Sequence, residues 1–198
     1  PTPEIDIMPD KFNGCSPLDV TFENETTEAV NWFWTMGNGA QTSEQNPLIH
    51  FDSPGVYDVQ LMAVSEHGCQ KVEFFEDMIE VFEVPVADFH FTPEDDIIYE
   101  LDITFADSSA GATHYNWSFG DGYHSDETNP VHHYEQGGNF YVNLEVTNDY
   151  GCGSEMSKLV KIDNTFYLFM PNTFTPDGDG LNDVFMPTFS SKEEIREY

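Results

Sequence analysis

The sequence predicts an all-β protein that consists of two tandem antiparallel β-sandwiches and the first strands of a third sandwich. Three observations support this fold class: a long internal repeat, an alternation of apolar and polar residues within each copy, and no stretch with a convincing helical period. A chain of 198 residues is long enough for two small domains and part of another. We expect these domains to span residues 1–83, 84–164 and 165–198.

The repeat is a long segment that occurs twice without a gap. One copy runs from Trp34 to Cys69 and the other from Trp117 to Cys152, so both ends are offset by 83 residues. The copies share the tryptophan, both glycines of a Gly-x-Gly turn, an Asn-Pro pair and the closing Gly-Cys. A match of this length indicates two copies of one domain.

Each copy has the pattern of short strands separated by tight turns. In the second copy, Tyr115, Trp117 and Phe119 alternate with polar residues, and the segments 101–105 and 140–146 show the same alternation. Period two places one face of each strand in a core. Short alternating strands with regular turn signals in about 80 residues are typical of a small sandwich, with Trp34 and Trp117 facing the opposite sheet.

The charge restricts the class of partner. The formal net charge is −31, and only six residues are basic. Such a surface repels nucleic acid and anionic membranes, and no run of 18 apolar residues is present to insert into a bilayer. Two interpretations of the acidity remain open: solubility in a saline medium, and binding of divalent cations.

Three cysteines allow one disulfide. Cys15 and Cys69 both fall in the first copy, whereas Ile98 stands where the second copy would carry the earlier cysteine. We predict a Cys15–Cys69 disulfide, which leaves Cys152 as a buried free thiol. A disulfide indicates an oxidising compartment outside the cytoplasm. No Cys-x-x-Cys pattern is present to suggest a zinc or redox site.

The second copy contains "WSFGDG" (117–122) followed by "NPVHHYEQGGNFYVNLEVTNDYG" (129–151), and it closely resembles a PKD (polycystic kidney disease) domain. The first copy departs from the hallmark at Met36, Asn38 and Phe51. The resemblance covers about residues 1–163 and implies Ig-like β-sandwiches that act as non-catalytic spacers or interaction modules. The positions that carry the motif are Trp34, Gly37, Gly39, Trp117, Gly120, Asp121 and Gly122.

The residues that look catalytic have simpler structural interpretations. Asp121 aligns with Asn38, which cannot ionise, so both suit a tight turn. His132 and His133 are adjacent and would point to opposite faces of a strand; only His133 has a histidine counterpart, His50. We expect His50 and His133 to be partly buried and bonded to a neighbouring loop. No nucleophile elbow is present, and the chain is predicted not to be an enzyme.

Two further surfaces could bind ligands. Phe33 has the opposite parity to the tryptophans beside it, and one ring of the pair at 74–75 must point outward, so stacking on a polysaccharide is an alternative role. At the junction, Glu83, Asp88 and Asp107 could coordinate calcium or could be solvated carboxylates.

The stretch "PNTFTPDGDGLNDVF" (171–185) closely resembles the start of the gliding-motility-associated C-terminal domain of Bacteroidetes, with Asp177 where the hallmark has Asn. The resemblance implies export by the type IX secretion machinery to the outer cell surface or the medium. The apolar run 166–170 is predicted to be a buried strand of this incomplete domain. The loop is dense in turn residues, and calcium is the cofactor that its oxygens would suit; the candidate ligands are Asp177, Asp179, Asn182 and Asp183.

Together these features predict a non-catalytic stalk or spacer of a secreted or cell-surface bacterial protein, adhesin-like in role, that leads into a sorting domain. Its expected partners are the type IX machinery and surface polysaccharides or other surface proteins. The alternative is the accessory tail of a secreted hydrolase, with a carbohydrate-binding role.

Overall fold

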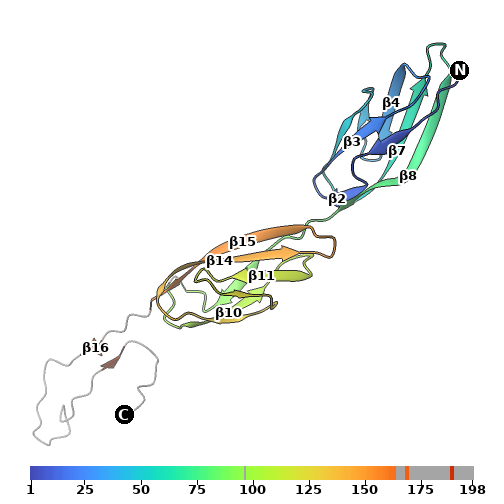
Figure 1. The fold of residues 1–198 in the computed structure, drawn as a ribbon. Helices are drawn as coiled ribbons and strands as arrows, with labels where there is room; N and C mark the ends of the chain where they lie inside the picture. Colours follow the sequence, from blue (N-terminus) through green and yellow to red (C-terminus); the bar gives the residue numbers. More distant parts are fainter. Residues whose placement is uncertain (96, 164–167, 170–187, 190–198) are drawn as a thin grey trace, which may run out of the picture. The chain divides into compact units, whose positions relative to one another are not determined.

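The computed structural model describes residues 1–95, 97–163, 168–169 and 188–189, and every regular element among them is a β-strand (Figure 1). The all-β prediction is therefore confirmed. Within this described part, no helix is long and apolar enough to cross a membrane.

The first repeat folds into a three-stranded sheet of order β1-β3-β6 and a five-stranded sheet of order β2-β8-β7-β4-β5. Its strands are β1 (Ile7–Pro9), β2 (Asn13–Cys15), β3 (Leu18–Asn24), β4 (Asn31–Met36), β5 (Gln41–Thr42), β6 (Leu48–Phe51), β7 (Gly55–Val64) and β8 (Gln70–Phe82). β2 runs parallel to the end of β8, with Cys15 opposite Phe82. The other strand pairs of this repeat are antiparallel.

Alternation along the strands builds the core of the first repeat. In β3 every second residue is buried, so Val20 and Phe22 point inward while Asp19 points outward. Trp34 is 1% exposed and packs on Phe22 with ring centroids 5.5 Å apart. Its indole Nε1 donates to the backbone oxygen of Glu44 at 2.9 Å, which satisfies the polar atom of a buried aromatic residue.

The second repeat has the same two-sheet construction, with orders β13-β10-β9 and β12-β11-β14-β15. Its strands are β9 (Phe89–Thr92), β10 (Asp102–Asp107), β11 (His114–Ser118), β12 (His124–Ser125), β13 (Val131–His133), β14 (Gly138–Thr147) and β15 (Gly153–Ile162). Trp117 is fully buried, and its Nε1 donates to the backbone oxygen of Glu127 at 2.8 Å, as Trp34 does to its own loop. The fold thus consists of tandem β-sandwiches, as predicted.

The chain also divides into two compact units whose limits differ from those of the repeats. The first unit contains Pro1–Asp88, Ser109–Tyr115 and Glu145–Glu155. The second contains Phe89–Ser108, Asn116–Leu144 and the described residues from Met156 onward. The turn between β14 and β15 therefore belongs to the same compact unit as the whole first repeat.

Beyond the second repeat, two short strands are described. β16 (Leu168–Phe169) lies within the run 166–170 that was predicted as a strand, and it pairs antiparallel with β17 (Thr188–Phe189). The predicted calcium loop lies outside the described residues.

Candidate functional site

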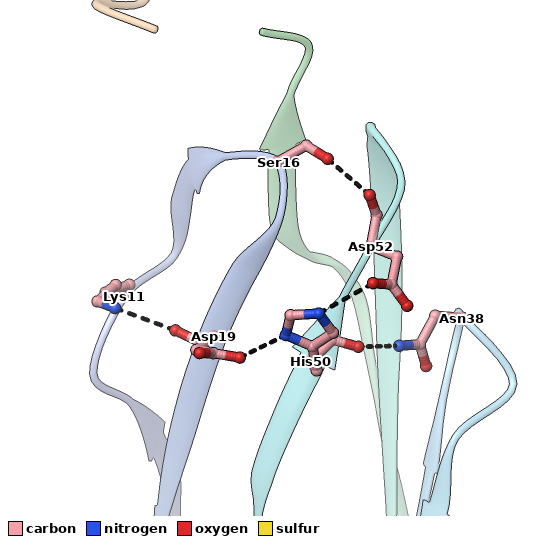
Figure 2. A network of polar contacts seen from close by, with 6 residues as sticks. All are labelled: Lys11, Ser16, Asp19, Asn38, His50 and Asp52. Atoms are coloured by element: carbon pink, nitrogen blue, oxygen red, sulfur yellow. Dashed lines mark hydrogen bonds and ion pairs between the residues drawn. The ribbon is translucent and has the colours of Figure 1, made fainter.

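A network of polar side chains lies on the outer face of the three-stranded sheet of the first repeat (Figure 2). Asp19 on β3 is directly opposite His50 on β6 in the strand register. The Nδ1 atom of His50 is 2.6 Å from Asp19 Oδ1, and its Nε2 atom is 2.9 Å from Asp52 Oδ1. The imidazole therefore lies between the carboxylate of Asp19 on the neighbouring strand β3 and the carboxylate of Asp52 in the loop that follows β6.

Both ring nitrogens can donate to carboxylates only when the imidazole is protonated. The hydrogen bond with Asp19 is the largest cause that raises the pKa of His50, and the nearby charge of Asp52 acts in the same direction. The side chain of His50 is 51% exposed, so solvent screens these ion pairs. Protonated His50 therefore links two strands at the surface, and its ion pairs contribute modestly to the stability of the fold.

Three further side chains complete the network without adding catalytic chemistry. Lys11 Nζ donates to the backbone oxygen of Asp19 at 3.0 Å, and Asn38 Nδ2 donates to that of His50 at 3.0 Å. The hydroxyl of Ser16 donates to the backbone oxygen of Asp52 at 2.6 Å. Covalent catalysis needs a hydroxyl that donates to its base, and this hydroxyl is directed to a peptide carbonyl instead.

The second repeat contains the equivalent pair. His133 Nδ1 is 2.7 Å from Asp102 Oδ1, again across directly opposed strand positions. The prediction that His50 and His133 are partly buried is wrong, whereas the predicted bond to a neighbouring loop is confirmed for His50, whose Nε2 contacts Asp52 after β6. Both are exposed, because they occupy outward positions where the nearest polar partner is the carboxylate on the opposite strand.

A second histidine–carboxylate pair occurs only in the second repeat and was missed in the sequence. His132 points inward: its ring stacks on Phe119 with centroids 4.0 Å apart, and its Nε2 lies 2.7 Å from Asp121 Oδ2. The two side chains are 11% and 15% exposed. In the first repeat the same positions are Ile49 and Asn38, so the ionisable residues replace neutral ones together. This paired difference between the repeats is the sequence signal that indicates the His132–Asp121 contact.

Asp121 also has the turn role expected from sequence. Its Oδ1 accepts from the backbone N–H of Tyr123, as Asn38 Oδ1 accepts from that of Ala40. Gly120 has a φ of +84°, and a Cβ at that position would lie 2.8 Å from the backbone oxygen of Tyr141. Glycine is therefore required there by both conformation and space.

The predicted Cys15–Cys69 disulfide is wrong: the bond joins Cys15 to Cys152, with Cα atoms 5.6 Å apart. Cys69 is the exposed free thiol. Cys69 immediately precedes the first residue of β8, whereas Cys15 pairs with Phe82 at the last residue of that strand. The length of β8 separates them by roughly 40 Å at about 3.3 Å per residue, and a disulfide needs Cα atoms within about 7 Å.

The disulfide belongs to a set of contacts within the first compact unit. Phe82 stacks on Tyr150 with centroids 4.1 Å apart, and Asn148 Nδ2 donates to the backbone oxygen of Glu83 at 2.8 Å. These residues line an open groove of about 350 Å³. Besides the aromatic pair, the groove is lined by four polar side chains, Glu83, Thr113, Asn148 and Asp149. The Thr113 hydroxyl donates to Asp149 Oδ1 at 2.8 Å, and none of the described residues that line the groove is a histidine or cysteine that could act as a base or nucleophile.

The metal predictions have different outcomes. Within residues 1–95 and 97–163, no three acidic, histidine or cysteine side chains gather closely enough to hold an ion, so Glu83, Asp88 and Asp107 form no such group. The other candidate ligands, Asp177, Asp179, Asn182 and Asp183, lie outside the described residues and stay a prediction.

The fold and its surface networks define a class of protein: tandem Ig-like sandwiches stabilised by cross-strand polar contacts. A model of the PKD domain matches residues 1–81 and 83–162, and the chain belongs to the PKD domain family. Domains of this family are adhesion or spacer modules of extracellular proteins and are typically non-catalytic.

The chain is also similar to several solved structures. The PKD1 domain from the Vibrio cholerae metalloprotease PrtV is 30% identical over 40% of this chain and 98% of its own, with a TM-score of 0.37. The PKD1 domain of Vibrio anguillarum Epp is 26% identical over 40% of this chain and 94% of its own, with a TM-score of 0.37. The fibronectin(III)-like modules of Clostridium thermocellum CbhA are 15% identical over 79% and 93%, with a TM-score of 0.41.

Proposed function

We propose that this chain is the spacer and interaction region of a secreted or cell-surface bacterial protein, adhesin-like in role, and that it leads into a type IX secretion sorting domain. The observation that carries the spacer role is the tandem of two PKD sandwiches whose polar networks are structural. A disulfide that links Cys15 to Cys152 supports an oxidising location outside the cytoplasm.

The sorting proposal rests on the motif at 171–185, whose last two residues begin the apolar group at 184–189. It is tested on the full-length protein in its own host, by comparing a normal strain with one that lacks the type IX secretion machinery. We expect external protease to reach the PKD repeats in the normal strain and the protein to stay in the periplasm of the mutant.

A matched variant that lacks residues 165–198 should behave in the normal strain as the intact protein does in the mutant. Surface delivery that persists in both cases would refute the sorting role. It would leave the spacer role untouched, because that role depends on the folded repeats.

A second role is favoured by the two exposed phenylalanines, Phe33 and Phe74, on the first repeat. In this role the chain is the accessory tail of a secreted hydrolase and holds the enzyme on a polysaccharide. The sequence encoded upstream of Pro1 separates the roles: further repeats support an adhesin, and a protease or glycosidase signature supports the tail.

We also propose that calcium binds the loop of Asp177, Asp179, Asn182 and Asp183, because these supply the oxygen ligands that the ion prefers. Calorimetric titration of the chain with calcium chloride should show one stoichiometric site, which Asp179→Asn removes. An identical isotherm for the variant would assign the heat to diffuse binding by the acidic surface.

A further inference from the structure

The outer face of the five-stranded sheet in the first repeat carries a row of exposed apolar side chains. The strand register places Phe33 of β4 opposite Met62 of β7, and Met62 opposite Val72 of β8. Phe74 lies on β8 two residues beyond Val72, so it points to the same face. Phe33, Val72 and Phe74 are 47%, 51% and 57% exposed, so large apolar side chains of β4 and β8, which flank β7, lie in solvent on one face of the sheet.

The residues around this apolar row are neutral, and all but Val64 have side chains that can form hydrogen bonds. The same register places Asn31 and Gln70 on one side of it, and Thr35 and Gln60 on the other. With Val64, these positions form a three-by-three array of outward residues on β4, β7 and β8, and none of the nine is charged. In a chain with a net charge of −31, an uncharged face of this size is a specific feature.

The second repeat supplies an internal comparison, because it has the same strand order but a different face. At the positions of Phe33 and its three apolar neighbours, 83 residues later, stand Asn116, Glu145, Glu155 and Ser157. The fold therefore does not require apolar residues on this face. The first repeat lacks these charges and has two aromatic rings instead, at a cost in solubility that a spacer role alone does not explain.

We propose that this face of the first repeat binds a neutral polysaccharide. The two rings offer flat apolar surfaces for the C–H faces of sugar rings, and the flanking amides of Asn31, Gln60 and Gln70 offer both donors and acceptors for hydroxyl groups. Phe33 and Phe74 lie on strands separated by β7 and are offset by two residues along them. That spacing is roughly 12 Å between Cα atoms, so an extended chain of several sugars contacts both.

Charge favours a neutral polysaccharide over the other partners that could cover this apolar sheet face. A second copy of the chain has the same net charge of −31, which opposes its association, and an anionic polysaccharide or membrane meets the same repulsion. A cationic partner would be drawn to the acidic surfaces elsewhere and would find no carboxylate among the nine positions. A neutral, hydroxyl-rich chain is complementary to an uncharged face with aromatic rings and amides.

The inference rests on the proposed interaction role but not on the secretion route. A binding measurement on the purified chain therefore succeeds or fails independently of any export defect. The probes are neutral hexasaccharides of β-linked glucose, α-linked glucose and β-linked N-acetylglucosamine, with an alginate hexasaccharide as the anionic comparison. Calorimetry should detect binding of at least one neutral probe and no binding of alginate.

Phe33→Ala and Phe74→Ala should each weaken that binding by about tenfold or more, because each removes the apolar contact of one ring. Tyr141→Ala is the matched control: this aromatic residue is 68% exposed on the second repeat and should leave the affinity unchanged. Thermal unfolding should be the same for all variants, since the replaced rings face solvent.

Three results would overturn the proposal: no neutral probe binds, binding survives both phenylalanine substitutions, or Tyr141→Ala weakens it equally. Sedimentation velocity supplies the remaining test. A dimer that dissociates in Phe33→Ala would identify a second copy as the occupant and would also refute the polysaccharide.

Discussion

Removal of the Cys15–Cys152 bond is the perturbation with the largest expected effect on stability. The bond closes a loop with a sequence separation of 137, and the chain-entropy model assigns about 5 kcal/mol to such a loop if the chain unfolds in one step. If the second repeat unfolds while β2 stays paired with β8, the free loop is about half as long and the value falls to about 4 kcal/mol. For a protein of this size the loss corresponds to roughly 10–20 °C in melting temperature.

The assay compares three serine variants by thermal unfolding under non-reducing conditions. Cys15→Ser and Cys152→Ser should each show the full decrease, and together they should show no more than either alone. Cys69→Ser is the matched control, because its thiol is exposed and free, and its melting temperature should match that of the parent chain. Peptide mapping without reduction should recover a cross-linked peptide pair that contains Cys15 and Cys152.

The reasoning is refuted if Cys69→Ser is as unstable as Cys15→Ser, or if Cys152 reacts with a thiol reagent in the folded chain. Intact mass cannot decide, since either pairing removes two hydrogens. A small loss in both disulfide variants, below about 1 kcal/mol, would contradict the loop-entropy estimate while leaving the pairing in place.

Three further predictions follow from the site. His132→Ile leaves the Asp121 carboxylate without its histidine partner and should lower the free energy of unfolding, measured in urea, by about 2–3 kcal/mol. The double variant with Asp121→Asn reproduces the first repeat and should recover at least about 1 kcal/mol, whereas strictly additive effects would rule out coupling between the two residues. Gly120→Ala should lower the free energy of unfolding by several kcal/mol in the same assay, because the added Cβ meets a backbone oxygen of β14. Gly122→Ala is the control in the same turn and should cost less, because a Cβ there meets open space. The pKa of His50, measured by NMR, should lie above the ordinary value of about 6.5, and Asp19→Asn should lower it; an unshifted titration would contradict the ion pair. The contribution of this ion pair to stability is complete below about pH 6.5 and is lost as the pH rises through the raised pKa.

The sequence was sufficient for the fold because the repeat and the alternation report directly on strand faces. The parity of Phe33 correctly indicated an exposed ring, and the buried positions of Trp34 and Trp117 followed from the same period. Each inference needed only the rule that successive side chains point to opposite faces of a strand.

The disulfide could not be predicted in this way, because alternation gives the face of the sheet on which a residue lies but not its position along the strand direction. Cys15 and Cys69 belong to one repeat and lie at opposite ends of β8. The His132–Asp121 contact was missed for a related reason. Only a comparison of both positions between the repeats would have shown that the two ionisable residues occur together.

The position of the disulfide also determines how the protein carries a pulling load. Tension applied to the chain on either side of the linked cysteines passes through the sulfur atoms and bypasses residues 16–151. Those residues represent about 450 Å of extended chain that cannot be drawn out while the bond is intact. Under tension the oxidised protein can lengthen only through the segments outside the two cysteines, and reduction would add the extension of residues 16–151 as the repeats unfold.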